Sequence, residues 1–183
     1  MNANIPTRRA EFGPFQFLKT NSRLVMALLA VGLLALRADA QTNLSTADQT
    51  FILSAAQGGM TEVKLGELAA QKGTREDVKS FGKMMVKDHT AINDDLTALA
   101  AQKAVMIPAA LDAEHQATVD KLTALSDADF DGAYIADMIK GHKSTAKAFK
   151  AEAAATTDAD IKAFLDKSLP IVQAHLKHLK AMK

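Results

Sequence analysis

The sequence predicts an all-α protein, folded as an antiparallel bundle of four long helices. Alanine, which has the highest helix propensity, fills 28 of the 143 positions from residue 41 onward. That stretch has one Tyr and five Phe, and runs of β-branched or aromatic residues are scarce, which argues against strands. Apolar residues recur there at steps of three and four, the period of a helix that is buried on one face.

Residues 1–40 have the features of a signal peptide that precedes one domain, residues 41–183. An uncharged apolar run of 13 residues, 24–36, lies between four basic side chains and the tripeptide Ala38-Asp39-Ala40. We place the cleavage after Ala40 and expect an exported, periplasmic protein. The alternative is an uncleaved anchor that tethers the chain to the inner membrane. A helix made of the 13-residue run would be only about 20 Å long, which is too short to span a hydrocarbon core of roughly 30 Å.

Start and stop signals divide the domain into four long helices and one short one. The expected caps are Ser45 or Thr46, Thr74 in a variant capping box, Ser126, and Thr157-Asp158. The expected helices are about 46–71, 74–103, 111–125, 127–155 and 157–183. Gly73 ends the first helix, and Pro108 separates the second from the short third. Pro170 lies inside the last helix, where it removes one backbone hydrogen-bond donor.

Each long helix carries an apolar stripe that should face the core. The stripes of the last three are Val78, Phe81, Met85, Ile92, Leu96 and Leu99; then Ile135, Met138, Ile139 and Phe149; then Ile161, Phe164, Leu165, Leu169, Val172, Leu176 and Leu179. The first helix offers two registers, Phe51-Ala55-Gly58-Glu62-Leu65 and Ile52-Ala56-Gly59-Val63. Its adjacent glycines would let another helix approach closely.

Three histidines lie on or beside these stripes, on three different helices. His89, His142 and His175 each lie near the middle of a long helix, so antiparallel packing brings them to one level. Glu62 takes a comparable position in one register of the first helix. The four residues suit Zn²⁺, Fe²⁺, Mn²⁺ or Cu²⁺, because imidazole nitrogen and carboxylate oxygen are good donors to these ions. The alternative is that each histidine lies at the core edge, with its polar tip in water or hydrogen-bonded to a neighbour.

Other polar patterns in the sequence are weaker evidence for a binding site. Asp88 either orients an imidazole or is a solvated charge, and Asp112-Ala-Glu-His115 has the spacing of paired ligands but lies on the short helix.

The chain has no Cys, which excludes disulfides, thiolate metal sites and iron–sulfur clusters. Residues 1–40 hold five of the 22 basic and two of the 21 acidic side chains, so the domain has a net charge of −2 and no electrostatic support for nucleic-acid binding.

Several short sequence motifs resemble those of a bacterial family of exported proteins called domain of unknown function 4142. They are Phe51-x10-Glu62-Val63, Met85-Val86-x-Asp88-His89, Phe130-Asp131-x2-Tyr134 and Leu169-Pro170-x4-His175-Leu176. The resemblance covers about residues 45–181 and implies a ferritin-like four-helix bundle. It points to Glu62, His89, His142 and His175, and it supplies no reaction.

The ferritin-like di-iron pattern is not reproduced in full. Those sites use two Glu-x-x-His pairs, whereas the residues three positions before the histidines are Val86, Ile139 and Val172. We therefore expect a mononuclear site rather than a dinuclear oxidase centre.

The sequence leaves three functions open. The first is a periplasmic metal-binding bundle for storage, buffering or stress protection. The second is a non-catalytic helical module of the cell envelope, which binds another protein or a second copy of itself. A metal-dependent redox enzyme is a third hypothesis, and it requires an open coordination position. We expect no nucleic-acid partner and no stable membrane insertion of residues 41–183.

Overall fold

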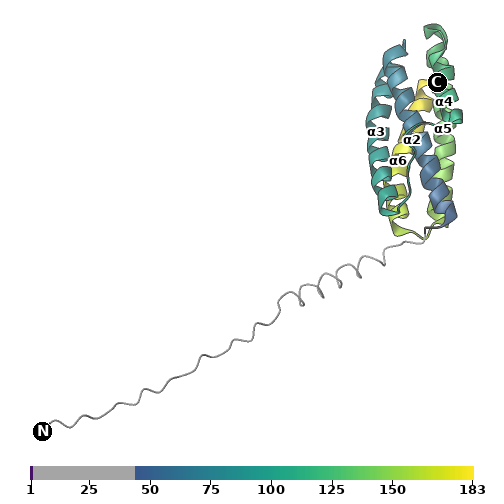
Figure 1. Cartoon of the computed structure of the whole chain (residues 1–183). Helices are drawn as coiled ribbons and strands as arrows, with labels where there is room; N and C mark the ends of the chain where they lie inside the picture. The colour runs from purple at the N-terminus through teal and green to yellow at the C-terminus, as the bar shows by residue number, and fades with distance from the viewer. Residues whose placement is uncertain (2–43) are drawn as a thin grey trace. The chain divides into compact units, whose positions relative to one another are not determined.

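The computed structural model describes Met1 and residues 44–183, and every regular element in that part of the chain is a helix (Figure 1). The helices are α2 (Thr46–Lys72), α3 (Glu76–Gln102), α4 (Ala113–Thr123), α5 (Asp127–Ala155) and α6 (Ala159–Met182). The predicted all-α class, with a short helix between the second and third long helices, is confirmed. The expected signal peptide and its cleavage site lie outside the described residues. None of the described helices is long and apolar enough to cross a membrane.

The four long helices form a square in which each one packs against two neighbours, in the order α2, α3, α6, α5. Contacts between helix ends show that neighbours run antiparallel. Lys72 at the end of α2 places its Nζ 3.4 Å from Oδ1 of Asp127 at the start of α5. Lys103, just after α3, pairs with Asp158 and Asp160 at the start of α6, at 2.6 Å each. The connection from α3 to α5 therefore returns along the bundle, and its helix α4 packs on α2 and α5.

The predicted caps of α2, α5 and α6 are confirmed, and that of α3 is wrong. Ser45, Ser126 and Asp158 each accept a backbone N–H with a side-chain oxygen. Thr74 instead donates its hydroxyl to Asp131 of α5, whose carboxylate also accepts the backbone N–H groups of Thr74 and Arg75 at 3.0 and 2.8 Å. The N-cap residue of α3 is Arg75, which makes no side-chain cap hydrogen bond, and Asp131 binds the residues just before the first turn of the helix.

The stripes predicted for α3, α5 and α6 face the core, with Ile139, Leu169 and Leu176 only half-buried at its edge. The buried residues of α2 come from both registers, because Ile52, Ala56 and Glu62 are all buried. Of the predicted glycines, Gly59 leaves room for the Asn93 side chain of α3, but the closest approach of two backbones occurs at a glycine pair that the sequence did not single out. A Cβ on Gly82 of α3 would lie 2.6 Å from the carbonyl oxygen of Gly66 on α2.

Gly82→Ala should therefore destabilise the fold. The new methyl group would meet backbone atoms of α2, the Gly66 oxygen and the Ala70 nitrogen at 2.6 and 2.7 Å, which cannot move aside as a side chain can. We expect a loss of about 1–3 kcal/mol in the free energy of unfolding, measured by urea denaturation. Gly132→Ala is the matched control, since a Cβ there meets no atom within 4 Å. The control should gain up to about 1 kcal/mol from helix propensity. Equal stability of the two variants would contradict the tight α2–α3 contact.

Candidate metal centre

Three histidine rings meet in the middle of the bundle. His89 of α3, His142 of α5 and His175 of α6 are 4%, 1% and 2% exposed. Their ring centroids lie 5.4–5.6 Å apart, and one nitrogen from each ring lies within 4.8 Å of the other two. The structure thus brings together the three histidines that the stripes singled out.

Hydrogen bonds at the outer edge of the group fix which nitrogen of two rings carries the proton. His142 Nδ1 lies 2.9 Å from the carbonyl oxygen of Met138, and His175 Nε2 lies 2.9 Å from Oδ2 of Asp88. Carbonyl and carboxylate oxygens can only accept, so these two nitrogens donate. Neutral rings then carry their lone pairs on His142 Nε2 and His175 Nδ1.

Those two nitrogens and His89 Nε2 are buried and have no hydrogen-bond partner within the described part of the chain. Each such atom costs free energy, so three in one place require an explanation. Burial, followed by the effect of neighbouring histidines, lowers the pKa of His89 to about 3 and that of His142 to about 4. At neutral pH both rings are uncharged, which is the form that ligates a metal. The three histidines could therefore hold a metal ion.

Glu62 borders this group without joining it. Its Oε1 lies 3.6 Å from His142 Nδ1, the nitrogen that already faces Met138, so the carboxylate is on the outer side of that ring. Its Oε2 is buried and has no hydrogen-bond partner among the residues from 44 onward. Burial, followed by the negative charge of Asp137, raises the pKa of Glu62 to about 8. Glu62 therefore keeps a proton at neutral pH in the folded chain.

The two weaker sequence candidates have different roles. Asp88 orients an imidazole, which is one of the two roles that the sequence suggested. The ring belongs to His175 of α6 rather than to the adjacent His89. Asp112 caps α4 by accepting the backbone N–H of His115, and it also contacts His115 Nδ1 at 2.8 Å. His115 lies outside the group of three histidines.

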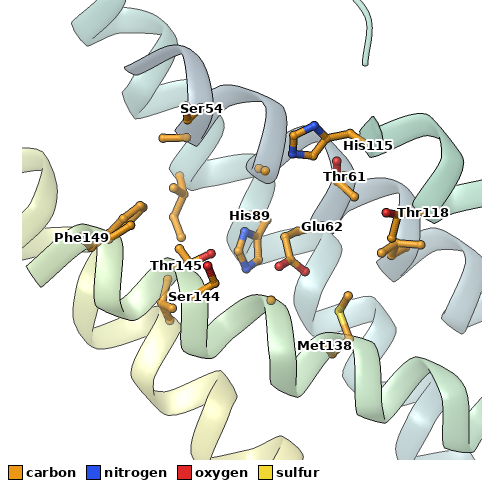
Figure 2. Close-up of a pocket in the computed structure, with 18 of the residues that line it drawn as sticks. Ser54, Thr61, Glu62, His89, His115, Thr118, Met138, Ser144, Thr145 and Phe149 are labelled. Atoms are coloured by element: carbon orange, nitrogen blue, oxygen red, sulfur yellow. The ribbon is translucent and has the colours of Figure 1, made fainter. Parts of the chain in front are cut away.

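A cavity of about 370 Å³ between α2, α4 and α5 reaches this site. Figure 2 shows Glu62 and His89 close together in it, with Ser144 and Thr145 of α5 beside His89 and Thr118 on the α4 side. The cavity was not predicted from the sequence. The signal that could have revealed it is the Phe51-Ala55-Gly58-Glu62-Leu65 register of α2, since all five of those residues line it.

Replacing Glu62 by Gln should stabilise the metal-free protein, and more so as the pH rises. The pKa of Glu62 is about 8 in the folded chain against an ordinary 4.5, so unfolding between these values releases a proton. Rising pH then favours the unfolded state, and Glu62→Gln removes this effect. The stability gained by the variant should grow by roughly 2–3 kcal/mol from about pH 5 to about pH 7, measured by urea denaturation. Titration of the histidines affects both proteins alike, so parallel pH profiles would contradict a protonated, buried Glu62.

Comparison with known proteins gives a family and a fold. Among curated proteins, none matches the chain. A solved structure described as the crystal structure of a DUF305 fragment from Deinococcus radiodurans is similar, with a TM-score of 0.67 and 11% sequence identity. The similarity covers 76% of this chain and 96% of that one, and at this identity it shows the fold alone. Residues 33–182 match the family described as Domain of unknown function (DUF4142). The predicted resemblance is confirmed, and the chain belongs to the DUF4142 family.

Proposed function

We propose that this protein binds one transition-metal ion through His89 Nε2, His142 Nε2 and His175 Nδ1. The observation that carries the proposal is the convergence of three buried histidines, of which one nitrogen each lies within 4.8 Å of the other two. Each ring also has a buried nitrogen without a hydrogen-bond partner in the described chain. Tetrahedral ligation at about 2.1 Å places ligand nitrogens about 3.4 Å apart, so small inward turns of the rings complete the site. An ion there would compensate for the burial of all three lone pairs at once.

The donor set narrows the choice of metal. Neutral imidazole suits Zn²⁺, Cu²⁺ and Fe²⁺, whereas Mn²⁺ prefers oxygen donors. The group of three contains no carboxylate, since Glu62 lies beside it. Mn²⁺ therefore fits least well of the four ions that the sequence suggested. Because the site has three donors on three helices, it is proposed as mononuclear, and storage, buffering or stress protection is the role that we assign to it.

The arrangement of helices supports placing this chain with the ferritin-like four-helix bundles. Two antiparallel pairs, α2–α3 and α5–α6, are joined by one long connection that returns along the bundle. One long crossover between two such pairs is the topology of ferritin-like folds, which build metal sites in the bundle interior.

We also propose that the chain is exported, with residues 1–40 as its signal peptide and the periplasm as its destination. The basic segment, the 13-residue apolar run and Ala38-Asp39-Ala40 support this. An inner-membrane anchor made of the same apolar run is the competing arrangement. The molecular mass of the protein recovered from the periplasm distinguishes the two, because cleavage after Ala40 removes 40 residues.

Removing one proposed ligand should abolish stoichiometric metal binding. We expect about one Zn²⁺ or Cu²⁺ per chain after reconstitution and dialysis of the native protein, measured by elemental analysis. His89→Ala and His142→Ala should each retain far less, with helix content checked by circular dichroism. His178→Ala is the matched control, because His178 is exposed on α6, three residues from His175, and is not in the group. A native protein that retains no metal, or a His178→Ala variant that loses it, would contradict the proposal.

Asp88→Ala should weaken metal binding without removing a ligand. The Asp88 carboxylate accepts from His175 Nε2 at 2.9 Å and so directs the Nδ1 lone pair into the site. Loss of such an orienting partner typically lowers metal affinity about 10–100-fold, which competition with a chromophoric chelator can measure. Asp94→Ala is the control for the change in charge, since Asp94 is exposed on the same helix. Equal affinities of the two variants would show that Asp88 does not position His175.

A further inference from the structure

The proposed site has three ligands on three helices, and the fourth long helix, α2, supplies none. α2 instead contributes Glu62 and part of the wall of the 370 Å³ cavity. Of the three proposed ligands, only His89 lines this cavity, together with Glu62. The cavity therefore meets the site on the side where the protein provides no ligand.

We propose that the cavity admits a small nitrogen or oxygen donor molecule, which coordinates the bound metal on the side facing α2. This inference rests on the proposed metal site. Three protein ligands leave at least one coordination position for such a molecule. A water molecule takes up about 30 Å³ in the liquid, so the cavity has room for a larger ligand.

Two buried groups in the cavity wall indicate a polar ligand. His89 Nε2 and Glu62 Oε2 both lack a hydrogen-bond partner in the described chain, and Glu62 is only 9% exposed. With the metal bound to His89, Glu62 Oε2 remains available to hydrogen-bond the incoming molecule. The hydroxyl groups of Thr61, Ser144 and Thr145 line the same space. A donor molecule thus has a metal position and several hydrogen-bonding partners.

Imidazole is a suitable probe of this space. It is a small nitrogen donor that carries no charge when it ligates a metal, so its binding depends little on the charges of Glu114, Asp137 and Lys140 in the cavity wall.

Gly58 allows the cavity to be filled without disturbing the ligands. It lines the cavity on α2, and a Cβ added there meets no atom within 4 Å. Its cavity-lining neighbours Ser54, Thr61 and Glu62 lie three or four residues away on the same helical face, so a side chain at position 58 extends into the cavity. Gly132 is equally open, lies on α5 and does not line the cavity. Gly58→Leu and Gly132→Leu are therefore matched variants.

The test loads the native protein and both variants with Co²⁺, whose visible absorption reports changes in its ligands, and then titrates imidazole. We expect a saturable spectral change while the metal stays bound, checked by elemental analysis after desalting. Gly58→Leu should bind Co²⁺ as well as the native protein but bind imidazole at least about tenfold more weakly. Gly132→Leu should match the native protein in both measurements.

The possible negative results separate an error in the inference about a further ligand from an error in the proposed metal site. If Co²⁺ binds in a histidine-dependent way and imidazole leaves the spectrum unchanged, the inference is wrong and the metal site stands. Equal imidazole affinity of Gly58→Leu and the native protein, or release of Co²⁺ by imidazole, also overturns it. If no stoichiometric metal binds, the proposed function fails and this inference fails with it.

Discussion

The constraint on which the bundle depends is a layer of polar groups buried across its middle. Glu62, His89, His142 and His175 lie at this level, one on each long helix. Along every helix the layer separates two apolar clusters: in α3, Met85 belongs to one cluster and Ile92 to the other. Burying polar atoms without partners is costly, and apolar residues in this layer would have joined the two clusters into one core. A layer retained at such a cost is better explained by binding than by stability.

The direction of each lone pair in this layer is set from outside it. The carbonyl oxygen of Met138 and the carboxylate of Asp88 occupy the outer nitrogens of His142 and His175, which turns the unprotonated nitrogens inwards. Burial and the mutual effect of the histidines then disfavour protonation of the inner nitrogens of His89 and His142. The same low-dielectric surroundings act on Glu62 in the opposite sense and keep its proton on. Burial is thus the largest cause of the neutral state of Glu62, His89 and His142 at neutral pH.

Features that depend on local sequence could be predicted, and features that depend on contacts between helices could not. Helix ends followed from caps such as Ser45 and Ser126, and the meeting of the histidines followed from their depth in antiparallel helices. The start of α3 could not be predicted in this way, because Thr74 bonds to Asp131 of α5 and the N-cap residue, Arg75, makes no side-chain cap hydrogen bond. The register of α2 was ambiguous for a physical reason. One face packs on α3 through Gly66, while the other lines the cavity, so neither reads as a simple core stripe.

The packing on either side of the polar layer bears on what a metal would do there. A structural metal site is usually closed by four protein ligands and often supplies the free energy that holds a small domain together. In this bundle, each apolar cluster contains twelve buried residues contributed by several helices. Packing of that extent can hold the helices together without an ion. A metal site made of three histidines beside a cavity is therefore poorly suited to stabilising the fold. It is better suited to an ion that exchanges or accepts a further ligand.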